Sequence, residues 1–136
     1  MIVFERPIRF DEVDPAGIVF FARYANFAHE AIENFFEDLE GGYPALIQKR
    51  RIGLPIVRYE ADFHAPLRFG DDVELDVTVA RLGAKSITFR YRVYRVGEPR
   101  VLAAEGRVVC AVVDLARFVA VAVPERVTQM LADLVE

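Results

Sequence analysis

The chain has 136 residues, a formal net charge of −4 and 54% hydrophobic residues. This length predicts one domain, residues 1–136, and the acidic balance argues against nucleic acid as the main partner. The lone Cys110 excludes an internal disulfide, and no apolar run approaches the roughly 20 residues that cross a bilayer. We expect a cytoplasmic protein without membrane insertion, whose apolar excess is covered in a homo-oligomer.

The first third of the chain predicts a strand, a turn and a long helix. Residues 3–11 form the expected strand, and Pro7 places it near a sheet edge because proline cannot donate to a ladder. Asp14-Pro15-Ala16-Gly17 has the residue types of a tight turn. Apolar residues then recur at the spacing of one buried helix face, and Gly41-Gly42 ends the helix. This face comprises Tyr24, Phe27, Ala28, Ala31, Ile32, Phe35, Phe36 and Leu39.

Most of the remaining chain predicts strands. One short helical turn is expected around residues 45–49, and Pro124 starts a short final helix. The expected strands span residues 56–65, 73–79, 86–96, 101–113 and 118–123. Alternation in the first of these places Val57, Tyr59 and Phe63 on one face. Tight turns imply antiparallel neighbours, so the pattern predicts an α+β fold with a sheet wrapped around one amphipathic helix.

Asp14 is the acidic side chain with the clearest chemical potential. Aspartate is common in turns simply because it accepts hydrogen bonds from its own backbone, and this is the structural interpretation. Its place just before a helix start supports a catalytic interpretation, since unpaired N–H groups and a partial positive charge gather there. A carboxylate beside such donors suits attack on a carbonyl group, whose oxygen becomes negatively charged during the reaction.

The other reactive side chains form no recognisable site. His29, His64 and Cys110 lack metal-ligand spacing, and the glycines do not form a phosphate-binding or dinucleotide-binding pattern. We therefore expect no metal and no cofactor. His29 is interpreted as a solvated or interface residue, and His64 as a structural one.

The run from Asp14 to Phe21, DPAGIVFF, followed by Tyr24 on a helix, resembles the signature of hotdog-fold acyl-CoA thioesterases. It is similar to the branch of 4-hydroxybenzoyl-CoA thioesterase and the Tol-Pal-associated thioesterases. The resemblance extends along nearly the whole chain, including Phe69-Gly70-Asp71 and Val123-Pro124-Glu125. It implies a hotdog fold, with a long central helix wrapped by a five- to six-stranded antiparallel sheet.

The same resemblance implies the site and the assembly. Asp14 would be the catalytic carboxylate, acting as nucleophile or general base, and the backbone N–H of Phe21 would polarise the thioester. The residues implied to contact the substrate are Gly17, Phe20, Tyr24, Val57 and Tyr59 for the acyl group and Lys85 and Ser86 for coenzyme A. Coenzyme A is part of the substrate. The resemblance also implies a homodimer with a continuous sheet, assembling into a tetramer, with each site at the dimer interface.

The sequence departs from the Tol-Pal branch at two positions, and it leaves alternative acyl groups and alternative functions open. Phe21 and Arg23 stand where the Tol-Pal branch usually has histidine and asparagine. Phe20 and Phe21 suit a flat or apolar acyl group, such as 4-hydroxybenzoyl. Residues 29–33 and 55–63 also resemble 1,4-dihydroxy-2-naphthoyl-CoA thioesterases. The alternatives to a thioesterase are a non-catalytic acyl-CoA binding or sensing module, a helix-mediated interaction protein and a hydratase.

Overall fold

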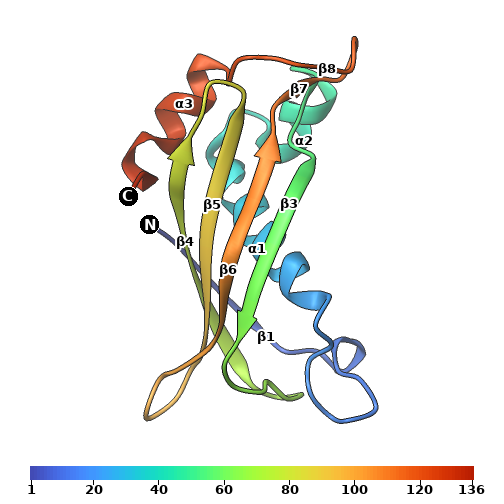
Figure 1. Ribbon diagram of the computed structural model, residues 1–136, viewed down its shortest axis with the longest axis vertical. Helices are drawn as coiled ribbons and strands as arrows, with labels where there is room; N and C mark the ends of the chain where they lie inside the picture. The colour runs from blue at the N-terminus through green and yellow to red at the C-terminus, as the bar shows by residue number, and fades with distance from the viewer.

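The computed structural model describes all 136 residues, and it contains an antiparallel five-stranded sheet with a long helix against one face (Figure 1). The strand order is β1-β4-β5-β6-β3. These strands are β1 (Ile2–Pro7), β3 (Ile56–Phe63), β4 (Asp72–Leu82), β5 (Ser86–Arg95) and β6 (Val101–Ala111). A second, three-stranded sheet contains β2 (Ile52–Gly53), β7 (Val113–Asp114) and β8 (Val119–Ala120). The predicted α+β hotdog fold is confirmed.

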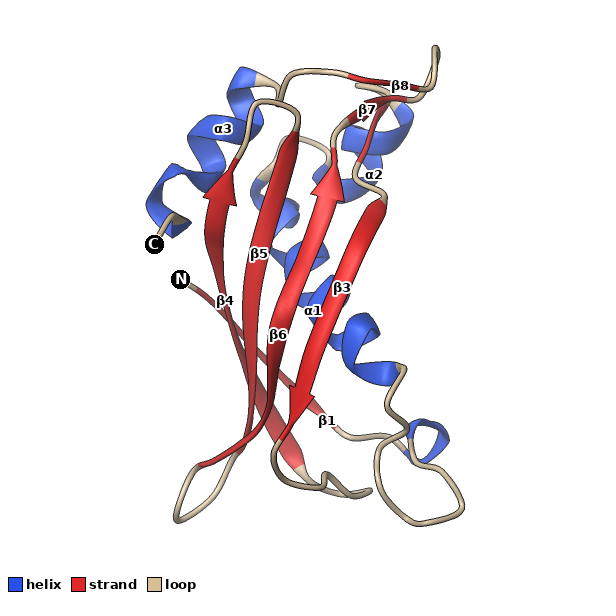
Figure 2. Cartoon of the chain, viewed as in Figure 1, coloured by secondary structure: helices blue, strands red, loops and turns tan.

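Three α-helices accompany the sheets, and Figure 2 shows helices in blue. The long helix α1 spans Arg23–Phe35 and continues as a 3-10 turn over Phe36–Asp38. It is therefore shorter than the sequence pattern predicted, because the last part of the apolar face belongs to that turn and to Leu39. Residues 42–48 form a complete helix, α2 (Gly42–Gln48), where only a single turn around residues 45–49 was expected. The final helix, α3 (Glu125–Leu131), follows Pro124 as predicted.

The core lies between α1 and the inward face of the sheet. The predicted helix face is confirmed, since Phe27 and Ala31 are completely buried. Alternate residues of β4 and β5 meet this face, among them Leu75, Val77 and Phe89. The alternation of buried and more exposed residues in the central strands therefore indicates a sheet that is covered on one face only.

The strand β3 is a free edge of the sheet. It pairs only with β6. The sequence alternation predicted one apolar face on this strand, with Val57, Tyr59 and Phe63. That face is only partly covered, since Val57 is 65% exposed and Phe63 is 50% exposed. No further strand pairs with β3, so the strand presents unpaired backbone groups and partly exposed apolar side chains to solvent.

The first strand ends earlier than predicted. It stops at Pro7, and residues 10–12 form a 3-10 turn instead of a continuation of the strand. The physical reason is a local hydrogen bond, because the carboxylate of Glu12 accepts the backbone N–H of Arg9 at 2.8 Å. The position of the strand at the sheet edge, inferred from Pro7, is confirmed.

Candidate active site

Asp14 lies in a compact turn that is closed by its own hydrogen bonds. An antiparallel bridge joins Val13 to Val19, and the Asp14 N–H donates to the Ile18 carbonyl at 2.9 Å. Gly17 adopts a φ of +82°, which glycine tolerates without strain. The Asp14 Oδ1 atom accepts the Ala16 N–H at 2.8 Å. One carboxylate oxygen thus fixes the turn, while Oδ2 has no partner within the chain.

A buried ion pair anchors the segment that leads into this turn. The Arg6 guanidinium donates to both carboxylate oxygens of Glu12, at 2.9 and 2.6 Å, and its Nε lies 2.7 Å from Glu30 on α1. The backbone carbonyl of Glu12 also accepts the Phe20 N–H at 3.0 Å. Burial alone would raise the pKa of Glu12, but the bonds from Arg6 and the Arg9 amide, with the charges of both arginines, lower it overall.

Backbone donors are left unused in the segment just before α1. The amides of Phe20, Arg23 and Tyr24 are all hydrogen-bonded within the chain. The N–H groups of Phe21 and Ala22, between them, donate to no atom of the protein. A helix start normally leaves such donors for water or a ligand. The amide predicted to polarise the thioester is therefore available.

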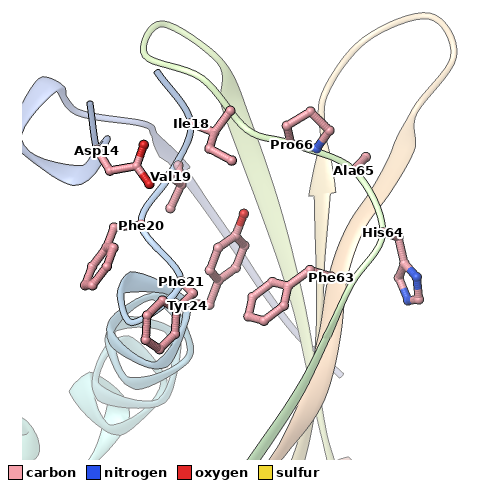
Figure 3. Close-up of a pocket in the computed structure, with 10 residues that line it drawn as sticks. All are labelled: Asp14, Ile18, Val19, Phe20, Phe21, Tyr24, Phe63, His64, Ala65 and Pro66. Carbon is pink, nitrogen blue, oxygen red and sulfur yellow. The ribbon is translucent and has the colours of Figure 1, made fainter. Parts of the chain in front are cut away.

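Asp14 and the start of α1 line one largely apolar pocket with a volume of about 430 Å³ (Figure 3). One wall comes from the Asp14 turn and the helix start, and the other comes from the segment at the end of β3. The lining residues are Asp14, Ile18, Val19, Phe20, Phe21, Tyr24, Phe63, His64, Ala65 and Pro66. The pocket thus combines a single carboxylate with a predominantly hydrophobic wall.

Tyr24 is the central side chain of this pocket. It is 4% exposed, and its ring contacts those of Phe63 and Phe27, with centroids 5.0 and 5.6 Å apart. Burial, with a smaller contribution from the charge of Tyr59, raises the pKa of Tyr24 to about 12. The phenol is therefore neutral near pH 7.

The structure brings some of the predicted site residues together and separates others. Asp14, Phe20, Phe21 and Tyr24 line the pocket, whereas Gly17 shapes the turn without lining the pocket. Val57 and Tyr59 do not line it either. Val57 is exposed on the edge strand, and the hydroxyl of Tyr59 lies 2.7 Å from that of Tyr91.

Lys85 and Ser86 lie far from this pocket in the same chain. They belong to the turn between β4 and β5, whereas the Asp14 turn is at the opposite end of the sheet (Figure 1). Lys85 is exposed and its carbonyl accepts the Val112 N–H at 2.9 Å. A single chain therefore does not unite the predicted coenzyme A residues with the predicted carboxylate.

Sequence reasoning missed the second wall of the pocket. Phe63, Ala65 and Pro66 were assigned only to a strand and its end. In the structure, Leu67, which follows Pro66, joins this segment to the Asp14 turn. The carbonyl of Leu67 accepts the Val19 N–H at 2.8 Å. His64 borders the pocket, but its ring points away from the other lining side chains and lies 3.2 Å from Glu105 (Figure 3). The break at Pro66 was the one available signal.

Two general features complete the description. None of the helices is long and apolar enough to cross a membrane. No group of three or more His, Cys, Asp or Glu side chains is arranged to hold a metal ion.

Comparisons with known proteins agree with this geometry. The thioesterase-like superfamily matches residues 8–131. A 1,4-dihydroxy-2-naphthoyl-CoA hydrolase from Microcystis aeruginosa is 32% identical over 107 residues, which are 79% of this chain and 77% of the relative. The Dynemicin thioesterase has a TM-score of 0.89 and 27% identity, covering 99% of this chain and 97% of that one. A gentisyl-coenzyme A thioesterase has a TM-score of 0.80 and 27% identity, covering 92% and 98%.

These matches confirm the family and leave the branch as a prediction. The superfamily match spans residues 8–131, and the prediction of a thioester hydrolase is confirmed at the level of the family. The narrower resemblance to the 4-hydroxybenzoyl-CoA and Tol-Pal branch is not confirmed, since the curated relative is a dihydroxynaphthoyl-CoA hydrolase. On the matched length and the shared fold together, the chain belongs to the thioesterase-like superfamily.

Proposed function

We propose that this protein is an acyl-CoA thioesterase that hydrolyses an aromatic acyl-CoA to the free acid and coenzyme A, with Asp14 as the catalytic carboxylate. One observation carries the proposal. Asp14 and Phe21, whose backbone amide is unpaired within the chain, both line the same apolar pocket. A thioester needs these two groups, because its carbonyl carbon must be attacked while negative charge grows on its oxygen.

Two routes use the same arrangement. In the first, Asp14 Oδ2 attacks the carbonyl carbon, the carbon–sulfur bond breaks, coenzyme A leaves as a thiolate, and water hydrolyses the resulting mixed anhydride. In the second, the carboxylate takes a proton from a water molecule as that water attacks the carbonyl carbon; the carbon–sulfur bond then breaks, coenzyme A leaves as a thiolate, and the proton held by Asp14 passes to the thiolate. In both routes the Phe21 N–H donates to the oxygen that becomes negative. Neither route requires a metal or a further cofactor.

The shape and lining of the pocket support an aromatic acyl group. Its volume of about 430 Å³ is within the range of small-molecule sites, roughly 300–1,000 Å³. The rings of Phe20, Phe21, Tyr24 and Phe63 offer faces and edges against which a planar ring packs favourably. Relatives named for 1,4-dihydroxy-2-naphthoyl-CoA and gentisyl-coenzyme A point to the same class. 4-Hydroxybenzoyl-CoA belongs to this class as well.

The free edge of β3 supports a dimer that completes the site. Pairing two β3 strands in antiparallel fashion would cover their unpaired backbone groups and exposed apolar side chains, including Val57. A two-fold axis perpendicular to the sheet reverses its two ends. The turn with Lys85 and Ser86 of one subunit would then lie at the same end as the Asp14 pocket of the other. A coenzyme A bound between subunits would thus have a basic residue near its tail. The tetramer remains a prediction.

The decisive test is release of free thiol from a panel of acyl-CoAs. The panel contains acetyl-, palmitoyl-, benzoyl-, 4-hydroxybenzoyl- and 1,4-dihydroxy-2-naphthoyl-CoA. We expect the wild type to prefer the aromatic esters, and Asp14→Asn to lower kcat by about 10³-fold or more while the Ala16 hydrogen bond to the turn is kept. Asp11→Asn, which changes an exposed carboxylate three residues away, is the matched control and should retain activity. Binding of these esters without thiol release would overturn the proposal in favour of a sensing module.

A further inference from the structure

The hydroxyl of Tyr24 lacks a partner although the residue is almost completely buried. Tyr24 is 4% exposed, and its hydroxyl makes no hydrogen bond within the chain. Asp76 Oδ1 is the only fully enclosed side-chain oxygen or nitrogen without a partner. The Tyr24 hydroxyl is therefore not enclosed by protein, and it lines the pocket. Figure 3 shows this hydroxyl pointing into the middle of the pocket, between the Asp14 turn and the segment with Phe63 and Pro66.

No neighbouring side chain hydrogen-bonds this hydroxyl. Five of the lining residues, Ile18, Val19, Phe63, Ala65 and Pro66, have no polar side-chain group, and the Asp14 carboxylate bonds the Ala16 amide instead. A hydroxyl enclosed by protein normally has a protein partner, as Tyr59 has in Tyr91 at 2.7 Å, whereas a hydroxyl that opens into a pocket is bonded by what fills the pocket. An unpaired phenol in an apolar wall is therefore a position at which a ligand supplies the missing partner.

The chemistry of the phenol defines what that partner is. Tyr24 is protonated near pH 7 as an ordinary phenol is, and burial raises its pKa further, to about 12. A neutral phenol both donates and accepts one hydrogen bond, which matches a hydroxyl substituent on the acyl group. The thioester oxygen has its own candidate donor in the Phe21 amide. The Tyr24 hydroxyl is thus free to bond a polar group on the acyl group, away from the thioester.

The geometry points to Tyr24 as the specificity-determining residue, whose hydroxyl hydrogen-bonds a ring hydroxyl of the aromatic acyl group. This inference rests on the proposed function and adds the atom that selects among aromatic substrates. A site built to bond a substrate hydroxyl rejects the analogue that lacks it, because the protein group is then left unpaired. We expect a preference of about ten- to a hundred-fold in kcat/KM for a correctly placed hydroxyl.

The test is a cycle that removes the hydroxyl from the enzyme, from the substrate and from both. Wild type and Tyr24→Phe are assayed for kcat/KM with benzoyl-CoA and with 2-, 3- and 4-hydroxybenzoyl-CoA. The wild type should prefer at least one hydroxylated ester about tenfold or more. Tyr24→Phe should lose more activity toward that ester than toward benzoyl-CoA, so that the preference collapses toward unity. The matched control is Tyr43→Phe, a tyrosine packed on Phe36 outside the pocket, which should keep the wild-type preference.

Binding provides a readout that is independent of turnover. Calorimetry with the Asp14→Asn protein should show the same substrate preference, and adding Tyr24→Phe should abolish it. Equal losses for all four esters would assign Tyr24 a packing role and overturn the inference, as would a wild type indifferent to ring hydroxyls. Hydrolysis of aliphatic esters alone would also overturn it while leaving thioesterase activity intact. Absence of any thiol release is a separate result that rejects the proposed function itself.

Discussion

Arg6 and Glu12 form a buried, two-point ion pair, and Glu12 lies two residues before Asp14 in the chain. Arg6 belongs to β1, and its Nε also contacts Glu30 on α1 at 2.7 Å. Its guanidinium carbon is 4.3 Å from the centroid of the Phe27 ring. One arginine therefore connects the edge strand, the segment leading to the Asp14 turn and the central helix.

The first prediction concerns this pair. Glu12→Gln keeps the shape of the side chain but removes the charge that faces Arg6. Removing one partner of a buried ion pair typically lowers the free energy of unfolding by about 3–5 kcal/mol. We expect a loss of about 3 kcal/mol, because Arg6 keeps Glu30 as a charged partner. Urea denaturation at pH 7 measures the loss. Glu5→Gln, on an exposed residue of the same strand, is the control and should change stability by less than about 0.5 kcal/mol.

The same variant makes the pH dependence testable. The pKa of Glu12 is lowered by folding, so its contribution to stability is present above the unfolded pKa, near 4.5, and is lost as pH falls through the folded value. The difference in unfolding free energy between wild type and Glu12→Gln should therefore be greatest near neutral pH and shrink below about pH 4. A difference that stays constant down to pH 3 would contradict the role of this carboxylate.

A second prediction addresses the Phe21 amide. Phe21→Pro removes the N–H group that no other atom of the chain uses. Loss of one such donor typically lowers kcat by about 10²–10³-fold, and we expect this range with little change in KM. Phe21→Leu is the control, because it alters the side chain and keeps the amide. If both variants lose activity equally, the ring and not the amide is the important group; circular dichroism would verify that the proline variant is folded.

A third prediction concerns the free sheet edge. Val57→Lys introduces a charge on β3, where the side chain is 65% exposed in the single chain. A dimer formed through β3 would bury this charge, so the variant should be monomeric at micromolar concentration by analytical ultracentrifugation and should lose activity. Val3→Lys is a matched control on the opposite edge strand, where the valine is 51% exposed. Dissociation by Val3→Lys instead of Val57→Lys would assign the interface to β1.

A fourth prediction concerns Gly106, which lets β3 approach β6 closely. A Cβ atom at this position would overlap the carbonyl oxygen of Glu60 and lie 2.8 Å from the Tyr91 hydroxyl. Gly106→Ala should therefore push the edge strand outward and destabilise the fold by about 1–3 kcal/mol, measured by the urea midpoint. Gly70→Ala is the comparison, because its Cβ would meet open space and only backbone strain at φ +92° remains. We expect about 1 kcal/mol for that change.

The sequence predicted the elements whose signals are local. Alternation located the central strands, and the spacing from Tyr24 to Ile32 located the buried face of α1. The turn chemistry of Asp14 and Gly17 also predicted the conformation correctly, since Gly17 has a positive φ. These features depend on residues that are neighbours in the chain, and their physical rules act over one to four positions.

The features that the sequence did not reveal depend on distant contacts. No local pattern marks Arg6 and Glu12 as a buried pair, because only the folded chain brings them together with Phe27 and Glu30. The second wall of the pocket was missed for the same reason, since Pro66 and the Asp14 turn are about 50 positions apart in the sequence. Periodicity carries no information about which loops meet at one end of a sheet.

The two walls of the pocket have separate origins in the chain, and this has a consequence for how the site can diversify. The Asp14 turn is closed by its own hydrogen bonds and by the Val13–Val19 bridge. Residues 63–66 contribute the facing wall from another loop. Under the proposed function, substitutions in that loop would reshape the apolar wall around the acyl group while the Asp14 turn keeps its hydrogen bonds. Tyr24 on α1 would select the ring hydroxyl, so recognition of the acyl group would be divided between the two walls.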